Sequence, residues 1–308
     1  MQPQNRLDFA AEVKAVVSKA TAIRCDEPLA KRTTLRVGGP ADFYVEPANE
    51  ADLAAVLKFC GRRAAAFFIL GRGSNLLVRD GGFRGVVLCL SHSAFSQIEF
   101  SGETMRCGAG AKLKSVAVEA RRKGLSGVEF LEGIPGTVGG ALRMNAGAMG
   151  GQTFDVVERV RLMDFAGNVT EMPREKMAVA YRGCATLKDH VALAAIFKCR
   201  NASREEIEDR MKSFSQKRWD SQPAAPSAGC IFKNPSTVPA GKLVDELGLK
   251  GGRVGGAAVS AEHGNFIVNE GKATARDVLE LIEILKAKAK ARRGIELQTE
   301  VEIIGADV

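Results

Sequence analysis

Short apolar runs separated by polar or glycine-rich segments recur along the first two thirds of the chain. The runs 64–70, 76–78 and 86–90 have strand length and are bounded by turn-forming residues. Residues 157–164 and 191–198 have the same character and flank a more polar stretch. The pattern predicts short buried strands at all five places.

Helical spacing alternates with these runs. Apolar residues recur from 53 to 60 with the period of a helix, directly after Asn49, a favoured N-cap residue. Residues 112–123 read as a second helix, and Gly124 stands where such a helix commonly stops. The mixture predicts a protein in which helices and strands share the core.

Composition changes at residues 201–219, which are polar and highly charged and open with a capping box from Ser203 to Glu206. This segment predicts an exposed linking helix and the main domain boundary. Beyond it we expect a short helix near 242–247, strands at 266–268 and 297–304, and a long helix capped by Thr274. The long helix ends in a basic run, which favours a solvated helix end over a phosphate-binding patch.

The composition is that of a soluble globular protein with about two compact units. The chain has 308 residues, 45% of them hydrophobic and 26% charged, and no uncharged apolar run approaches the roughly 18 residues that span a bilayer. The net charge of +8 suits anionic partners, but aromatic residues make up only 6%, which is poor for nucleic-acid stacking. We expect a cytoplasmic monomer that binds small phosphorylated ligands, without nucleic acid or membrane partners.

Cysteine and histidine are scattered along the chain. The seven cysteines include no CxxC pair, and the three histidines lie far from one another in sequence. This pattern predicts neither a disulfide framework nor a zinc site, and we expect no bound metal.

Glycine is enriched, with 33 residues in all, and it is clustered. Between the apolar runs 64–70 and 76–78 lies the loop Gly71, Arg72, Gly73, Ser74 and Asn75. Such a loop exposes backbone amides that bind phosphate oxygens, and its side chains add donors and charge. It matches neither the GxGxxG nor the P-loop pattern. Taken alone, the loop favours an ordinary hairpin turn over an anion site.

A second glycine-rich segment runs from Gly133 to Gly151, with seven glycines in 19 residues. Its composition is poor material for a helix or a strand, so we expect irregular backbone that wraps a large flat ligand. A purely structural glycine loop is the alternative. Two such segments together favour a dinucleotide cofactor.

Five motifs in order resemble the UDP-N-acetylenolpyruvoylglucosamine reductase family, flavoenzymes of peptidoglycan precursor synthesis also called UDP-N-acetylmuramate dehydrogenases. The resemblance spans about residue 24 to Gly305. Its motifs are Thr33–Gly39, Gly71–Asn75, Gly133–Gly151, Tyr181–Arg182 and Pro226–Pro235. The short stretch between Tyr181 and Val191 is similar to the second, shorter type of the family.

The resemblance implies an α+β fold: a two-lobed FAD-binding domain of the vanillyl-alcohol-oxidase (PCMH) type and a C-terminal α+β substrate-binding domain. We expect the FAD domain at 1–200, with lobes at about 1–90 and 91–200, and the substrate domain at 201–308. The last strand, about 297–305, is a candidate to return to the first lobe.

The resemblance also implies an activity. NADPH reduces non-covalently bound FAD and leaves, and the enolpyruvyl group of UDP-N-acetylglucosamine enolpyruvate is then reduced to give UDP-N-acetylmuramate. Hydride adds to the terminal methylene carbon, and a proton goes to the carbon that bears the carboxylate. Charge therefore develops on the carboxylate, where positive groups and a proton donor are needed.

The family's catalytic residues fall on three positions. By motif, Arg182 would polarise the carboxylate, Cys230 would donate the proton and Glu300 would assist at the enolate. Serine commonly stands where this chain has Cys230, and often where it has Cys184. A thiol is a stronger acid than a hydroxyl and stays protonated at neutral pH, so the donor role is kept.

Binding residues follow from the loops and the motifs together. The predicted FAD contacts are Gly71, Arg72, Gly73, Ser74, Asn75, Gly133, Ile134, Pro135, Gly136, Thr137, Gly139, Gly140, Asn145 and Gly147. The candidate substrate or nicotinamide contacts are Tyr181, Gln222, Lys233 and Asn234.

Two other functions compete with this one. Another FAD enzyme of the same fold could oxidise small alcohols, often with flavin tethered to histidine; the nearest histidine here is His92, so tethering is not expected. A noncatalytic nucleotide-binding regulator is the second rival, and the combination of Arg182, Cys230 and Glu300 argues against it. A visible flavin spectrum separates the flavin enzymes from a protein that binds no FAD.

Overall fold

A computed structural model describes residues 3–308, with side chains from residue 8 onward. The described chain forms two compact units, each assembled from separate segments. Unit 1 holds Phe43–Arg72 and Gly85–Lys217 together with the chain up to Cys25. Unit 2 holds Asp26–Asp42, Gly73–Arg84 and Arg218–Val308. The predicted division at residue 200 concerns which part binds which ligand, and it stays a prediction.

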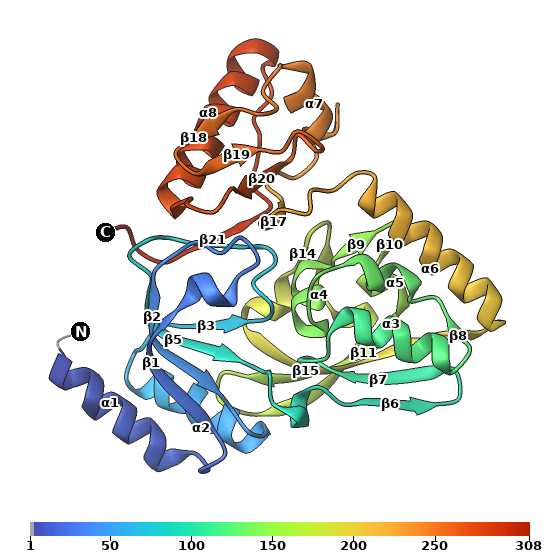
Figure 1. The fold of residues 1–308 in the computed structure, drawn as a ribbon. Coiled ribbons are helices and arrows are strands. Elements are labelled where there is room, and N and C mark those ends of the chain that lie inside the picture. The colour runs from blue at the N-terminus through green and yellow to red at the C-terminus, as the bar shows by residue number, and fades with distance from the viewer. Residues whose placement is uncertain (1–2) are drawn as a thin grey trace. The chain divides into compact units, whose positions relative to one another are not determined.

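Unit 1 contains a five-stranded antiparallel sheet, drawn in green and yellow in Figure 1, with strand order β12-β11-β15-β7-β6. The strands are β6 (Ile98–Ser101), β7 (Thr104–Gly108), β11 (Val157–Asp164), β12 (Val169–Pro173) and β15 (His190–Lys198). Strand β15 lies at the centre and buries six of the seven residues 191–197, because its two faces both pack on protein. The predicted strands at 157–164 and 191–198 are confirmed.

A second sheet, most of whose residues belong to unit 1, has the order β1-β2-β5-β3. Its strands are β1 (Ala22–Pro28), β2 (Pro40–Glu46), β3 (Phe67–Leu70) and β5 (Phe83–Cys89). Strand β3 runs parallel to β5, from the pair Phe67 and Val86 to the pair Leu70 and Cys89. Ala64, predicted to open β3, instead has a left-handed backbone with φ of 47° and ends the preceding turn.

Helices α1 (Pro3–Val16) and α2 (Glu50–Arg62) pack on each other in unit 1. The ring of Phe9 stacks on Phe43 with centroids 4.3 Å apart and meets Phe59 edge-on at 4.9 Å. Asn49 caps α2 as predicted, because its Oδ1 accepts from the Asp52 N–H at 2.9 Å.

Four further α-helices of the described chain lie wholly or mostly in unit 1. They are α3 (Leu113–Arg122), α4 (Val138–Met144), α5 (Thr153–Val156) and α6 (Arg204–Trp219). Short strand pairs accompany them: β8 (Leu125–Ser126) with β16 (Arg200–Asn201), β9 (Gly147–Ala148) with β10 (Gly151–Gln152), and β13 (Val179–Ala180) with β14 (Gly183–Cys184). Helix α3 ends before Gly124, whose φ of 69° confirms the predicted stop.

Helix α6 departs from the expectation of an exposed linker. Ile207 and Met211 are buried and join the core of unit 1, so one stripe of the helix is packed. The predicted cap is present, since the Glu206 N–H donates to Ser203 Oγ at 3.1 Å. The apolar positions are sparse among charged residues, which is why the pattern suggested a solvated helix.

Unit 2 is built around the antiparallel sheet β17-β20-β19-β18. Its elements, in orange and red in Figure 1, are β17 (Ser227–Cys230), α7 (Ala240–Glu246), β18 (Arg253–Val254), β19 (Ala257–Val259), β20 (Phe266–Asn269) and α8 (Ala275–Arg293). Helix α8 packs on β18 and β19 and contacts α7. The predicted capping box of Thr274 and Asp277 is present at its start. Strand β21 (Glu302–Ile304) pairs in parallel with β4 (Leu76–Val78), which lies within the predicted first lobe.

The basic end of α8 is paired. Lys286 lies 2.8 Å from Glu283, Lys290 lies 2.7 Å from Glu296, and Arg293 lies 3.0 Å from Glu246. The favoured interpretation, a solvated helix end, accounts for these contacts.

The segment Gly133–Gly151 is more regular than predicted, and the expectation of purely irregular backbone is wrong. Helix α4 and strand β9 lie within it, and β10 begins at its last residue. Val138, Ala141 and Leu142 are buried, and α4 packs on β7 and β15. Burial of these three side chains stabilises a short helix that glycine-rich sequence would not form alone.

No helix within residues 3–308 is both long and apolar enough to cross a membrane. In the same part of the chain, no three histidine, cysteine, aspartate or glutamate side chains gather as metal ligands.

Candidate active site

The loop 71–75 connects two strands that belong to different sheets, so it is not a hairpin turn. Gly73 is buried with a φ of 60°. A Cβ atom there would lie 2.6 Å from the carbonyl oxygen of Arg32 and 2.9 Å from the Cα of Thr33. The Gly73 carbonyl accepts from the Thr34 N–H at 3.2 Å. The close approach of two backbone segments therefore requires glycine at this position.

Within unit 1, the same loop reaches the second glycine-rich segment. A Cβ atom on Gly71 would lie 2.9 Å from Thr137 Oγ1, and this hydroxyl accepts from the Gly140 N–H at the start of α4 at 3.4 Å. Gly140 itself is exposed. The two segments that sequence analysis singled out thus meet at Gly71 and Thr137.

Not every amide of the second segment is available to a ligand. The Val138 N–H donates to the Ala111 carbonyl at 3.0 Å, and the Gly139 N–H donates to the Ala109 carbonyl at 2.8 Å. A Cβ atom on Gly139 would lie 3.2 Å from that of Ala109. Gly139 therefore serves close packing of α4 through its missing side chain. The predicted ligand residues Gly133, Ile134, Pro135 and Gly136 form the turn that leads to Thr137.

Asn145 ends α4 with a left-handed φ of 39° and is buried. Its Nδ2 donates to Gln152 Oε1 at 3.0 Å and to the Ala180 carbonyl at 3.3 Å, while its Oδ1 accepts from the Phe154 N–H at 3.2 Å. Asn145 therefore ties the glycine segment to the turn that carries the predicted arginine.

Arg182 lies in the tight turn between β13 and β14 and has a left-handed φ of 55°. A Cβ atom on Gly147 would lie 3.4 Å from Arg182 Nη1, so the guanidinium approaches the backbone of β9. The guanidinium carbon lies 5.2 Å from the ring centroid of Tyr181, which is 51% exposed. Unit 1 thus brings together Arg182, Tyr181 and the second glycine segment.

Unit 2 brings Cys230, Glu300 and Asn75 together. Cys230 ends β17, and the carbonyl of the next residue, Ile231, accepts from the Glu300 N–H at 2.8 Å. Asn75 Nδ2 donates to the Glu300 carbonyl at 3.1 Å, and the Asn75 carbonyl accepts from the Glu302 N–H at 3.0 Å. Cys230, the predicted proton donor, and Glu300 therefore lie on segments that are hydrogen-bonded to each other. Asn75 joins these segments to the glycine loop 71–75.

The candidate substrate residues of unit 2 lie along the same chain segments. The Gln222 N–H donates to the Arg218 carbonyl at 2.9 Å, and the Lys233 N–H donates to the Gln298 carbonyl at 2.9 Å. Asn234 Oδ1 accepts from the Ala240 N–H at 3.0 Å and so caps α7. Of these three, Asn234 lines the pocket described next.

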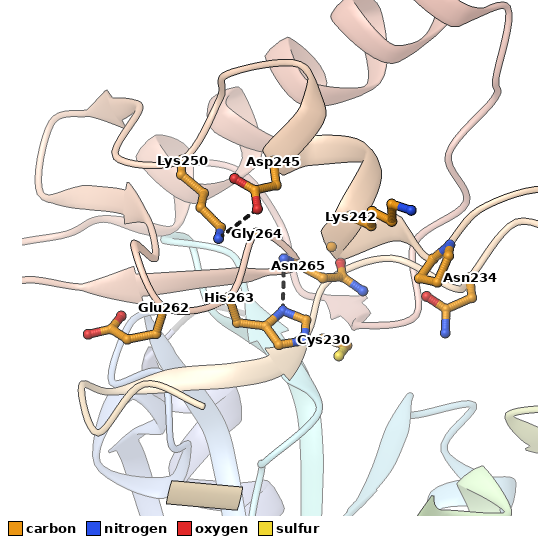
Figure 2. A pocket seen from close by; sticks show the side chains of 11 residues that line it. Cys230, Asn234, Lys242, Asp245, Lys250, Glu262, His263, Gly264 and Asn265 are labelled. Carbon is orange, nitrogen blue, oxygen red and sulfur yellow. Dashed lines mark hydrogen bonds and ion pairs between the residues drawn. The ribbon is translucent and has the colours of Figure 1, made fainter. Parts of the chain in front are cut away.

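A pocket of about 330 Å³ lies in unit 2 next to Cys230. Figure 2 shows its lining, which consists of Cys230, Asn234, Pro239, Gly241, Lys242, Asp245, Lys250, Glu262, His263, Gly264 and Asn265. The Lys250 ammonium lies 3.0 Å from Asp245, and the Lys242 ammonium lies 3.8 Å from Glu246. Sequence analysis missed Lys242, Lys250 and His263. The available signal was two lysines bracketing a short predicted helix after the Pro226–Pro235 motif.

Three buried thiols are poor nucleophiles. Burial raises the pKa of Cys60 and Cys199 each to about 11, and burial together with neighbouring Cys199 raises that of Cys107 to about 12. By contrast, Cys25 is exposed. The thiolate is the reactive form, so reaction should follow exposure and pKa.

We therefore expect iodoacetamide at pH 8 to alkylate Cys25 and to spare Cys60, Cys107 and Cys199 in the native protein, as read by peptide mass mapping. Below the ordinary thiol pKa of about 8.5 these thiols are protonated in both the folded and the unfolded chain, so the stability of the fold does not depend on their ionisation. Because the unfolded chain ionises first, this stability should decline as the pH rises from there toward 11. Equal labelling of Cys107 and Cys25 in folded protein would contradict the assignment.

Comparison with known proteins decides the family. The family model of the FAD binding domain matches residues 41–172, and that of the UDP-N-acetylenolpyruvoylglucosamine reductase C-terminal domain matches residues 222–304. The reductase of Clostridioides difficile (strain 630) is 41% identical over 98% of this chain and 100% of its own length. The chain belongs to the UDP-N-acetylenolpyruvoylglucosamine reductase family.

Other members of the reductase family agree over nearly the whole chain. The relative from Geotalea uraniireducens (strain Rf4) is 42% identical over 92% of this chain and 95% of its own. The crystal structure of the Thermus caldophilus enzyme aligns with a TM-score of 0.80 and 38% identity, covering 92% of this chain and 99% of that one. The predicted resemblance and the α+β fold class, with an FAD-binding domain and the reductase C-terminal domain, are confirmed. The chain is an FAD-dependent oxidoreductase.

The residues of the loop fit FAD. Gly73 leaves no room for a side chain, because the backbone of Arg32 and Thr33 lies where a Cβ atom would be. Thr33, whose methyl group lies 3.0 Å from the position of a Gly73 Cβ, has a buried hydroxyl with no hydrogen-bond partner in the part of the chain that the structure describes. A buried hydroxyl without a partner is unfavourable, so the Thr33 hydroxyl suits a loop that a bound anionic group completes.

Proposed function

We propose that this reductase converts UDP-N-acetylglucosamine enolpyruvate to UDP-N-acetylmuramate with electrons from NADPH, in the synthesis of peptidoglycan precursors. The observation that carries the proposal is the 41% sequence identity to the Clostridioides difficile reductase over 100% of that protein's length. We place the activity in a cytoplasmic monomer. FAD, when bound, supplies the hydride that adds to the terminal methylene carbon of the enolpyruvyl group.

Arg182 holds the substrate carboxylate in this proposal. Hydride addition leaves an electron pair on the carbon that bears the carboxylate, and this charge spreads onto the carboxylate oxygens. A guanidinium fixed in a tight turn can donate two parallel hydrogen bonds to those oxygens without moving. The left-handed backbone of Arg182 and its approach to Gly147 support such a fixed position.

Cys230 donates the proton that completes the reduction. The S–H bond breaks, its proton forms a new bond with the carbon that bears the carboxylate, and the thiolate left behind regains a proton from water. Glu300 would assist at the enolate from the segment paired to Ile231. Atoms and electrons then balance: one hydride and one proton have been added across the double bond.

The pocket beside Cys230 suits the diphosphate of the sugar nucleotide. Lys242 and Lys250 contribute positive charge beside the carboxylates of Asp245 and Glu262, and Asn234 adds a polar group. A diphosphate held there would direct the enolpyruvyl end of the same molecule toward Cys230. This arrangement supports Asn234 as a substrate contact and adds both lysines to the candidates.

FAD is proposed to lie along the loop 71–75 and the segment from Gly133 to Gly147. Arg72 and Ser74 supply side-chain donors, and the turn before Thr137 supplies backbone amides. Together these residues form the proposed FAD cradle. The Gly139 N–H is hydrogen-bonded within the protein, so Gly139 contributes to the cradle only because it lacks a side chain.

Gly140 tests this cradle without disturbing the fold. A Cβ atom there meets nothing nearer than 3.6 Å, whereas one at Gly73 would strike backbone. Gly61 is the matched control, since it also lies in a helix and its Cβ meets nothing within 4 Å. We expect Gly140→Leu to weaken FAD binding at least about tenfold, or ~1.4 kcal/mol, because the side chain enters the cradle. Gly61→Leu should bind FAD normally.

The measurement is FAD affinity by flavin fluorescence, with the melting temperature of both apoproteins alongside. Equal FAD affinity in the two leucine variants would remove Gly140 from the site.

The proposed function as a whole is tested by the spectrum and turnover of the purified protein. A yellow protein that oxidises NADPH only when UDP-N-acetylglucosamine enolpyruvate is present supports it. A protein that takes up no FAD would overturn it, and so would a yellow protein that oxidises small alcohols and leaves the sugar nucleotide unchanged.

A further inference from the structure

The strand that carries Cys230 is irregular. Pairing of β17 with β20 shifts register between Ser227 and Cys230, and Gly229 between them has a φ of 75°. An irregularity of this kind disrupts the ladder locally and re-aims the side chains beside it. Cys230 itself pairs with Phe266 after the irregularity, so the direction of its thiol depends on the contacts that hold the residues next to it.

Asn265 provides those contacts. Its side chain is 2% exposed and makes two hydrogen bonds to the backbone of Phe232. Nδ2 donates to the Phe232 carbonyl at 2.8 Å, and Oδ1 accepts from the Phe232 N–H at 2.9 Å. The backbone carbonyl of Asn265 accepts from the Ile231 N–H at 2.8 Å. One buried residue thus holds both residues that follow Cys230.

His263 holds Asn265 in turn. Its Nδ1 accepts from the Asn265 N–H at 3.1 Å, as the dashed line in Figure 2 shows. The imidazole lies 4.8 Å from the ring of Phe266, and a Cβ atom on Gly241 would come within 2.8 Å of its Cε1, so the ring is packed on two sides. Because Nδ1 accepts, the neutral ring carries its proton on Nε2.

The charge state of His263 agrees with this role. Burial, and to a lesser extent the positive charge of Lys250, hold the pKa of His263 below its usual value. At neutral pH the ring is uncharged and Nδ1 remains an acceptor. The hydrogen bond to Asn265 is therefore intact under working conditions.

We propose that His263 and Asn265 are positioning residues for Cys230: His263 Nδ1 fixes the backbone of Asn265, and Asn265 fixes the segment that presents the thiol. The inference rests on the proposed role of Cys230 as proton donor. It differs from a role of His263 in ligand binding, which would use Nε2.

Two substitutions separate these roles. An asparagine side chain can place its Oδ1 near the position of Nδ1, whereas glutamine reaches the position of Nε2. We expect His263→Asn to reduce the enolpyruvyl substrate nearly as fast as the parent. His263→Gln should lower kcat for that step about tenfold with little change in KM. Reduction of bound FAD by NADPH should be unchanged in both variants.

The proposal would be overturned if His263→Gln had normal kinetics while His263→Asn had a raised KM. Equal rates in both variants and the parent would also overturn it, and so would equal impairment of both.

A double variant distinguishes failure of this inference from failure of the donor role. If His263 acts through Cys230, His263→Gln should add nothing to the defect of Cys230→Ala. Independent, additive losses would contradict positioning while leaving the donor role in place. A fully active Cys230→Ala single variant would instead refute the donor role itself.

The pH profile gives a readout that altered packing alone would not move. The titratable and charged groups that line the pocket together with His263 are Cys230, Lys242, Lys250, Asp245 and Glu262. Protonation of Nδ1 removes the acceptor, so the substrate step should slow as the pH falls below the usual histidine pKa of about 6.5. His263→Asn should lose this acid limb. An unchanged acid limb in His263→Asn would overturn the proposal.

Discussion

Replacing Cys230 with alanine should leave reduction of bound FAD by NADPH intact and slow the reduction of UDP-N-acetylglucosamine enolpyruvate on the order of 100- to 10,000-fold. This is the range that a positioned general acid contributes. Cys230 is placed for the role at the end of β17, beside the pocket and next to the segment paired with Glu300. Stopped-flow absorbance of the flavin separates the two steps.

Cys230→Ser is the matched control, because a hydroxyl of similar reach can still pass a proton. We expect it to retain much of the activity and to lack the alkaline limb that ionisation of a thiol gives. If Cys230→Ala turns over as fast as the parent, the donor is another group, with an ordered water as the first candidate.

The second large effect should come from Arg182. Removal of one preorganised group that stabilises developing charge typically costs on the order of 100- to 1000-fold in rate. We expect Arg182→Ala to show this loss in reduction of the enolpyruvyl substrate while FAD reduction by NADPH stays near normal.

Arg200→Ala is the control for the loss of a positive charge in unit 1, since Arg200 is exposed and lies 3.5 Å from Glu206. Single-turnover rates measure both variants. Slow FAD reduction in Arg182→Ala with a normal substrate step would refute the proposed role of the arginine.

Local elements were predictable because their signals are local. The N-cap of α2 at Asn49 and the capping box of α8 involve residues three positions apart, and both are present. Helix α4 was missed because its stability comes from burial of Val138, Ala141 and Leu142, which short-range spacing does not reveal. Tertiary packing outweighed weak helix propensity there.

Site residues that belong to a recognisable motif could be predicted from the sequence. Site residues that only the fold brings together could not. Residues such as Cys230 and Glu300 came from the resemblance, and the structure adds that their segments are hydrogen-bonded through Ile231. Lys250 and His263 belong to no glycine loop and no quoted motif, and they gain a common pocket only through the turns around β18 and β20. The composition of each unit from separate segments was likewise invisible in the local pattern.

The most direct test of the central claim is a two-step anaerobic titration of the holoenzyme. We predict that NADPH bleaches the flavin band, and that one equivalent of UDP-N-acetylglucosamine enolpyruvate then restores it. Mass spectrometry should show a product heavier by two hydrogens, UDP-N-acetylmuramate. The account would be contradicted if NADPH bleached the flavin and oxygen reoxidised it, but the enolpyruvyl substrate left it bleached.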